Sequence, residues 1–162
     1  MRIRPRHLTP LLATTAVLAT TAAACGSSGP TPAEHVTTNI SIQNPGSAKK
    51  CTMTLRMLSP QDKQLTASLT VTCDFPVASM YTTLVIQGRP TGSGDTAWQN
   101  VDEPATTADT PPAVLTFTYN CVTGYDFQAS ASIDGSGADG SPFTATQTTT
   151  PRSYGASECS GK

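Results

Sequence analysis

Two short stretches of the chain alternate between apolar and polar residues, and each carries a cysteine at one end. From Cys51 to Met57 the odd positions are Cys, Met, Leu and Met, while the even positions are Thr or Arg. From Leu65 to Cys73 the odd positions are all apolar, and the even positions are Ser or Thr. A period of two predicts β-strands that each bury one face. The polar segment 59–64 between them predicts a turn, so the two strands should form a hairpin.

One register of this hairpin pairs every apolar residue of the first strand with an apolar residue of the second. Centred on Asp62, it gives the pairs Met57 with Ala67, Leu55 with Leu69, Met53 with Val71, and Cys51 with Cys73. Directly opposed residues on antiparallel strands lie about 4.5 to 5.5 Å apart at Cα, within the range that a disulfide requires. We therefore predict a disulfide between Cys51 and Cys73.

Further short strands separated by turns follow along the chain. We expect them over residues 80–87, 97–101, 115–121, 125–133 and 143–149, with 35–43 as an additional N-terminal edge strand. Seven or eight such strands predict an all-β fold, an antiparallel β-sandwich. One alternative concerns 115–121 and 125–133, which either form a direct hairpin around Gly124 or belong to different sheets.

The order of these residues over about 48–150 resembles a fibronectin type III domain. The run Leu69–Pro76 is similar to the second strand of that family and its proline, with Cys73 where the family has its core tryptophan. Tyr81 and Trp98 fall near two aromatic positions of the family, and the segment 123–127 resembles its corner-tyrosine region. The resemblance implies an immunoglobulin-like or fibronectin type III-like sandwich, in which 115–121 and 125–133 lie in different sheets.

The same resemblance implies how the remaining cysteines pair. In that topology Cys121 and the chain that leaves the last strand lie together at one pole, which implies a bridge between Cys121 and Cys159. The C-terminal tail, 151–162, would then be held against the domain. The rival pairing of Cys73 with Cys121 imitates an antibody-type bridge, but it would join opposite poles. The expected fold therefore contains two disulfides.

The N-terminal segment 1–25 resembles the signal peptide and lipobox of a bacterial lipoprotein. Three arginines and a histidine precede an uncharged stretch over 8–24, which ends in Ala22-Ala23-Ala24-Cys25. This stretch is too short and too rich in threonine to span a bilayer, so it indicates an export signal. Cys25 is also the odd cysteine of five, left over when the others pair. We expect it to carry the lipid anchor; the alternative is ordinary cleavage after Ala24, giving a secreted protein.

Composition then limits the partners and the domain plan. Without residues 1–24 the chain has 7 basic and 11 acidic residues, a net charge of -4, which gives no electrostatic case for nucleic acid. The expected plan is a signal peptide over 1–24, a lipidated flexible tether over 25–47, a β-sandwich domain over 48–150 and the tail over 151–162. The composition is similar to that of proteins from high-GC Gram-positive bacteria.

The sequence offers little for catalysis or metal binding. Beyond residue 24 the single histidine is His35, at the tether, so neither a catalytic triad nor a zinc site has its residues. The loop with Asp134, Ser136 and Asp139 lacks the order of a calcium-binding loop, and we expect a plain turn. We expect no cofactor and no metal.

The function that these observations favour is a non-enzymatic binding or interaction module. We expect it to be anchored through Cys25 to the outer face of the cytoplasmic membrane, with an envelope protein or glycan as its partner. Trp98 and Tyr81 are the candidate binding residues, although a sandwich usually buries its single tryptophan in the core. The alternative is a small envelope enzyme or ligand carrier that uses the acidic loop residues Asp102, Glu103 and Asp109.

Overall fold

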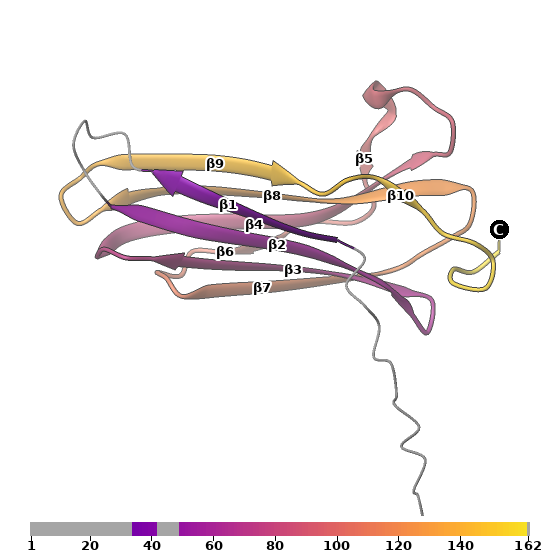
Figure 1. Ribbon diagram of the computed structural model, residues 1–162, viewed down its shortest axis with the longest axis horizontal. Helices are drawn as coiled ribbons and strands as arrows, with labels where there is room; N and C mark the ends of the chain where they lie inside the picture. Colours follow the sequence, from indigo (N-terminus) through magenta and orange to yellow (C-terminus); the bar gives the residue numbers. More distant parts are fainter. Residues whose placement is uncertain (1–33, 42–48, 162) are drawn as a thin grey trace, which may run out of the picture.

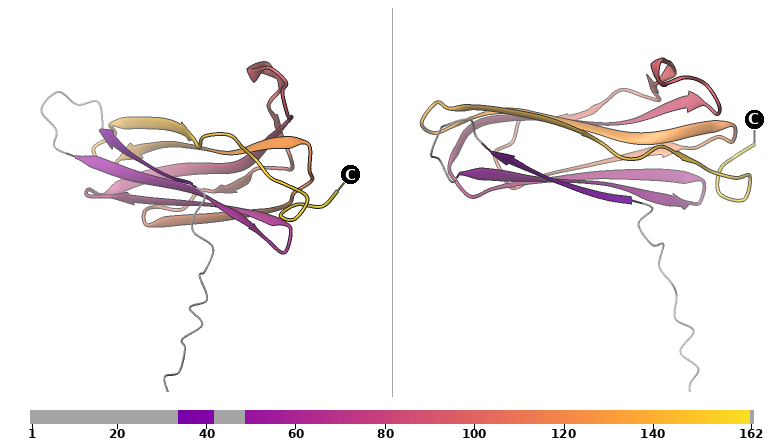
Figure 2. Two further views of the ribbon diagram at one scale, coloured as in Figure 1. Left: turned by 45° about the vertical axis from the view of Figure 1, so that its right-hand side comes forward. Right: turned by 45° about the horizontal axis from the view of Figure 1, so that its top comes forward.

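The chain folds into two facing antiparallel β-sheets. The computed structural model describes residues 34–41 and 49–161. The first sheet has the order β1-β2-β3-β7, and its strands are β1 (Glu34–Ser41), β2 (Lys50–Gln61), β3 (Gln64–Cys73) and β7 (Ala113–Asn120). The second sheet contains β4 (Val77–Pro90), β5 (Gln99–Asn100), β6 (Ala105–Thr107), β8 (Tyr125–Gly137), β9 (Pro142–Thr148) and β10 (Arg152–Ser153). Figures 1 and 2 show these two layers from three sides.

Within the second sheet, β4 and β8 form the centre. On one side β5 and β6 pair with β4, and on the other side β9 and β10 pair with β8. Seven of the ten strands in the described residues are seven residues or longer, and the other three have only two or three residues. The predicted all-β antiparallel sandwich is therefore confirmed. The N-terminal edge strand also forms, as β1 paired with β2.

The hairpin register predicted from the alternating pattern is confirmed. Strands β2 and β3 pair Met57 with Ala67, Leu55 with Leu69, Met53 with Val71 and Cys51 with Cys73. The connection is tighter than the predicted turn over 59–64, because β2 continues to Gln61. Only Asp62 and Lys63 form the turn, both with positive φ, 49° and 66°. Two such residues match the right-handed twist of paired strands.

Strands β7 and β8 lie in different sheets, as the fibronectin type III resemblance implied. Strand β7 pairs with β3, whereas β8 pairs with β4 along the whole of that strand, from Val77 to Pro90. The direct hairpin around Gly124 is therefore wrong. The reason lies in burial: separating the two strands puts Leu115 of β7 and Phe127 of β8 on the inner faces of opposite sheets.

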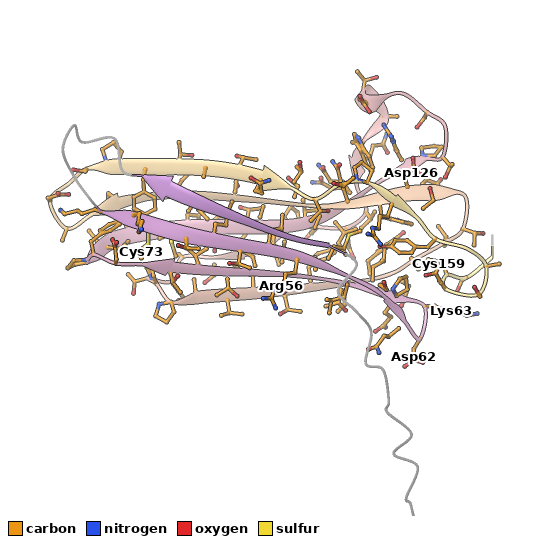
Figure 3. The ribbon with its side chains drawn as sticks, in the orientation of Figure 1. Arg56, Asp62, Lys63, Cys73, Asp126 and Cys159 are labelled. Atoms are coloured by element: carbon orange, nitrogen blue, oxygen red, sulfur yellow. A yellow bond between two sulfur atoms is a disulfide. The ribbon has the colours of Figure 1, made fainter. Side chains whose placement is uncertain are left out.

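Both disulfides form, one at each end of the sandwich. Cys51 is bonded to Cys73, and Cys121 is bonded to Cys159, so the rival pairing of Cys73 with Cys121 is wrong. Figure 3 shows Cys73 near one end of the strands and Cys159 near the other. We call these ends the Cys73 pole and the Cys159 pole. Disulfides of this kind belong to proteins that mature in an oxidising compartment.

The core between the sheets consists of aliphatic, methionine and aromatic side chains. The largest fully buried ones are Phe127, Met53, Leu55, Met57, Leu65, Leu69, Leu84, Ile86 and Ile133. Each removes apolar surface from water, a gain of about 1.5 to 3 kcal/mol for a side chain of this size. Within residues 34–41 and 49–161 no helix is long and apolar enough to cross a membrane.

Several element boundaries differ from those expected. Strand β4 is longer than 80–87, the segment 97–101 contributes only the two residues of β5, and the loop 102–112 contains β6. Strand β8 continues through Asp134 to Gly137, so Asp134 and Ser136, which were expected in a turn, belong to the strand. Long-range pairing with β4 explains the extension of β8, because Gly135 and Ser136 pair with Met80 and Ser79.

Candidate functional site

The two aromatic residues proposed for binding do not lie together. Tyr81 is on the outer face of β4, 49% exposed, while Trp98 follows the short 3₁₀ turn over 95–97. The ring of Trp98 lies over the guanidinium of Arg89, 4.5 Å away. Arg89 and Tyr81 are eight residues apart on one strand, about 26 Å at roughly 3.3 Å per residue. They therefore form no common patch, and each must be considered by itself.

Trp98 also does not occupy the core. It is only partly buried and packs on Arg89 rather than among the buried side chains between the sheets. The expectation that a sandwich buries its single tryptophan is wrong here, because the segment 91–98 leaves β4 before the chain returns as β5. Among the aromatic side chains of the described residues, Phe127 is the most deeply buried, 1% exposed.

A pocket of about 280 Å³ lies at the Cys159 pole. Four separate parts of the chain line it: Gly88 on β4, Gln99 to Val101 at β5, Tyr119 at the end of β7, and Val122, Tyr125 and Phe127 around the start of β8. Because the lining contains no Asp, Glu, Lys, Arg or His side chain, the pocket is polar and aromatic and carries no acidic or basic group.

Aromatic rings gather around the buried Phe127 at this pocket. Its centroid lies 6.0 Å from that of Tyr119, 6.3 Å from that of Tyr125 and 6.4 Å from that of Tyr154. All three pairs are tilted, at distances where aromatic pairs add about 0.5 to 1.5 kcal/mol beyond area burial. Tyr119, Tyr125 and Phe127 of this cluster form one wall of the pocket, on which the two tyrosines are partly exposed.

The floor of the pocket has no space for an additional side chain. Gly88 pairs with Phe127 on one side and with Gln99 on the other. A Cβ atom built on Gly88 would lie 3.1 Å from Cγ1 of Val101 and 3.2 Å from Cε1 of Phe127. A residue larger than glycine would therefore displace the side chains that form the floor.

A network of charges on the outer face of the same strands fixes the rim of the pocket. Nε of Arg89 donates to Oδ2 of Asp126 at 3.3 Å, and Nη1 donates to Oδ1 of Asp95 at 2.5 Å. Asp126 also accepts hydrogen bonds from the hydroxyls of Thr91 and Ser153, at 3.1 and 2.5 Å. These contacts tie the segment 91–98 and the C-terminal strand β10 to β4 and β8.

The network keeps its members charged. The hydrogen bond from Ser153 is the largest cause that lowers the pKa of Asp126, and bonds from Thr91 and Arg89 act in the same direction against desolvation. The hydrogen bond to Asp95 is the main cause that raises the pKa of Arg89. Asp126 and Arg89 are 13% and 15% exposed, so the ion pair is shielded from water.

The other acidic residues singled out in the sequence do not converge. Asp102 accepts from the backbone N–H of Glu103, and Asp109 accepts from the hydroxyl of Thr107 at 2.6 Å. These are local bonds of exposed loop residues. Across the described ranges, no group of three or more metal-ligating side chains gathers at one point.

At the opposite end, the loop residue Asp139 has a partner of its own. Its Oδ2 accepts from Nζ of Lys49 at 2.7 Å, and Oδ1 accepts from the N–H of Ser141 at 3.1 Å. The bond from Lys49 is the largest cause that lowers the pKa of Asp139 to about 2. The nearby Asp134 accepts from the hydroxyl of Thr144 at 2.7 Å. Asp139 is a turn residue, as expected, whereas Asp134 lies in strand β8 and not in the turn.

The pocket itself was not foreseen from the sequence, although two signals were present. Tyr119 comes two residues before Cys121, and Tyr125 occupies the corner-tyrosine position of the fibronectin type III resemblance. Neither signal indicates that β5 brings Gln99 beside them. Cys25 lies outside the described residues, so its lipidation stays a prediction.

No model of a known protein family matches this chain. No curated protein matches it in sequence either.

Proposed function

We propose that this chain is an exported lipoprotein that acts as a non-enzymatic binding module at the cell envelope. In this proposal Cys25 carries the acyl anchor on the outer face of the cytoplasmic membrane, and the pocket at the Cys159 pole is the binding site. The partner is an envelope protein or glycan.

The observation that carries the proposal is the chemistry of the pocket lining. General acid-base or nucleophilic catalysis needs an ionisable or activated group within hydrogen-bond reach of the substrate. The pocket instead offers tyrosines, amides and aliphatic groups, and no His, Asp, Glu, Lys, Ser or Cys side chain. The charged residues nearest in sequence, Arg89 and Asp126, are occupied with one another.

The export part of the proposal rests on the signal-like N-terminus and on the disulfides. Of the four bridged cysteines, Cys51, Cys121 and Cys159 are 0% exposed, and Cys73 is partly buried. A chain that folds around two such bridges requires an oxidising compartment during folding. The lipid on Cys25 would then hold the domain near the membrane, with the segment after it as a tether.

Intact mass tests the anchor. We expect membrane-derived protein to start at Cys25 with an acyl increment, and Cys25→Ser to release the domain into the medium. A mass that lacks the increment, or a mature chain that begins upstream of Cys25, would contradict the anchor and leave a secreted protein of the same fold.

Site-specific photocrosslinking tests the binding site. A photoreactive residue in place of Gln99, at the pocket rim, should give a discrete adduct in cells. The matched position is Thr72, which is exposed on β3 next to Cys73. An adduct from position 99 that disappears with Tyr125→Ala supports the proposal. Equal adducts from both positions, or none from position 99, would contradict it.

A further inference from the structure

We infer that the pocket at the Cys159 pole takes a single ring of a neutral carbohydrate. This inference rests on the proposed function, because it names the class of ligand for that binding site. Four observations lead to it: the charge of the lining, its aromatic faces, its hydrogen-bonding groups and its size.

The charge of the pocket argues against ionic ligands. Phosphate or carboxylate groups of a ligand are usually met by arginine or lysine, and metal cations are met by carboxylates. The lining contains neither. Arg89 lies on the outer face, where its ion pairs with Asp95 and Asp126 neutralise it. A neutral ligand therefore loses no ionic partner when it enters.

The aromatic wall matches the faces of a sugar ring. A pyranose presents a patch of C–H groups on each face, which is apolar, and hydroxyls at its edge. Tyrosine combines an apolar ring with a polar tip, so one side chain contacts both kinds of surface. Tyr119 and Tyr125 present such rings, supported from behind by the buried Phe127.

The hydrogen-bonding groups match hydroxyls, which both donate and accept. The exposed side chain of Gln99 makes no hydrogen bond to any part of the chain that the structure describes, and its amide supplies both functions. Gln99 is paired with Gly88, so the backbone register places it on the pocket side of β5. Its neighbour Asn100 accepts from Nε2 of Gln87 at 3.2 Å, which holds β5 in place.

The size of the pocket limits the ligand to one ring. The volume is about 280 Å³. Sites for drug-sized ligands begin at roughly 300 Å³ and are often several times larger. The close approach of Val101 and Phe127 to Gly88 closes the floor. A longer glycan would place one terminal or branching ring here, with its remaining units outside.

The competing ligand is a proline-rich peptide, because such peptides dock in aromatic-lined grooves. A groove needs aromatic rings in a row along the peptide. Here the rings of Tyr119, Tyr125 and Tyr154 surround one phenylalanine, at 6.0, 6.3 and 6.4 Å from it. This compact arrangement favours a ring-shaped ligand.

Titration of the full exported chain in detergent tests the inference, with saturation-transfer NMR as the readout. The probes are neutral trisaccharides of mannose, galactose, glucose and arabinose, with digalacturonate and a proline-rich decapeptide for comparison. At the ligand efficiency of ordinary small ligands, one bound hexose ring predicts a dissociation constant of about 1 mM. We expect at least one neutral trisaccharide to bind in this range, and digalacturonate to bind at least tenfold more weakly.

Three variants separate binding from folding. Tyr125→Ala should weaken the trisaccharide at least tenfold, and Gln99→Ala should weaken it several-fold. Because Gln99 is exposed, Gln99→Ala retains the fold even if Tyr125→Ala does not. The control is Tyr81→Ala, an exposed tyrosine at the far end of β4, which should change nothing.

Two results would overturn the inference in distinguishable ways. If no neutral trisaccharide binds at millimolar concentration but the photocrosslink from position 99 forms, the carbohydrate is wrong and the binding module stands. If the decapeptide or digalacturonate binds more tightly than every neutral trisaccharide, the neutral carbohydrate is likewise wrong and the binding module stands. If neither binding nor the crosslink appears, the proposed function fails as well.

Discussion

The two poles of the sandwich are built from the same kinds of parts, yet only one of them frames the pocket described above. Each pole has a disulfide, an aspartate in an ion pair and a cation over an aromatic ring. At the Cys73 pole Lys49 pairs with Asp139 and lies 6.0 Å from the ring of Phe75. At the Cys159 pole Arg89 pairs with Asp126 and stacks under Trp98.

The difference lies in what these parts connect. The Cys51–Cys73 bridge joins strands that are already paired in one sheet, and Phe75 packs edge-on against Phe143, 6.0 Å away. The Cys121–Cys159 bridge instead holds the C-terminal tail on the loop between β7 and β8, where the N–H of Thr123 donates to the carbonyl of Ser160 at 2.9 Å. In the described residues, the first pole shows aromatic rings packed against each other, whereas the second frames the pocket.

The largest effect should come from truncating the aromatic centre of the Cys159 pole. Phe127→Ala removes a fully buried ring and should destabilise the domain by about 3 to 5 kcal/mol. Phe143→Ala, with its ring 6% exposed, is the matched change at the other pole and should cost a similar amount. Urea unfolding measures both. A cost for Phe127→Ala below about 1 kcal/mol would mean that the aromatic cluster is not packed as described.

Removal of either disulfide should lower the free energy of unfolding nearly as much as the phenylalanine substitutions do. The bridged cysteines are 22 and 38 residues apart in sequence. Loops of this size give about 3 to 4 kcal/mol in the chain-entropy model, so the two variants should differ little in stability. The two double variants should differ in which amides exchange faster. Cys121→Ala with Cys159→Ala should increase amide exchange over 119–127 and at the tail.

The control for that exchange pattern is the bridge at the other pole. Cys51→Ala with Cys73→Ala should leave the pocket protected from exchange. The same exchange pattern in both variants would contradict the division of roles between the poles.

Replacing the ion-paired aspartates should lower the free energy of unfolding less than the changes above, and by different amounts at the two poles. Asp126→Asn weakens three hydrogen bonds of a shielded carboxylate and should cost about 1 to 3 kcal/mol at neutral pH. Asp139→Asn alters an exposed pair and should change stability less, as urea unfolding will show. Equal costs for the two variants would mean that burial does not distinguish the two ion pairs.

The pH dependence of stability follows from the same two carboxylates. Their folded-state pKa values are depressed, so their contribution is complete above the unfolded value near 3.8 and is lost as the pH falls through the folded value, about 2 for Asp139. Urea midpoints should therefore fall as the pH is lowered through this window. The urea midpoint should fall less with pH in Asp126→Asn than in the unmodified protein. An equal fall in the two proteins would show that Asp126 does not contribute to the pH dependence.

The smallest effect should come from the two cation-aromatic contacts. Trp98→Ala should cost about 1 kcal/mol, because Arg89 loses a stacked ring, and should increase amide exchange at Gln99 to Val101. Lys49→Ala should cost less than about 1 kcal/mol, since its ion pair is exposed. Exchange at the rim that does not respond to Trp98→Ala would show that the stack does not position β5.

The sequence predicted the hairpin in detail because side chains on a strand alternate, and one register satisfied four apolar pairs at once. The Cys121–Cys159 bridge followed from the family resemblance, which also placed β7 and β8 in different sheets. Trp98 was misjudged because composition says only that tryptophan is usually buried. Its place in space depends on where the chain leaves β4.

The pocket could not be predicted from local pattern. Its residues come from β4, β5, β7 and β8, and β5 has only two residues, too few for any periodicity. What creates the space is the pairing of Gly88 with both Phe127 and Gln99, a set of long-range contacts. Besides Tyr119 and Tyr125, a glycine within a strand was a further signal, because such a glycine often marks a close approach.

Hydrogen exchange of the protein, with and without solubilised envelope material, tests the central claim directly. The claim is that the Cys159 pole binds and the Cys73 pole only stabilises. Added envelope material should slow exchange over residues 99–101 and 119–127 and leave residues 72–76 and 138–142 unchanged. Protection at the Cys73 pole, or no protection at either pole, would contradict it.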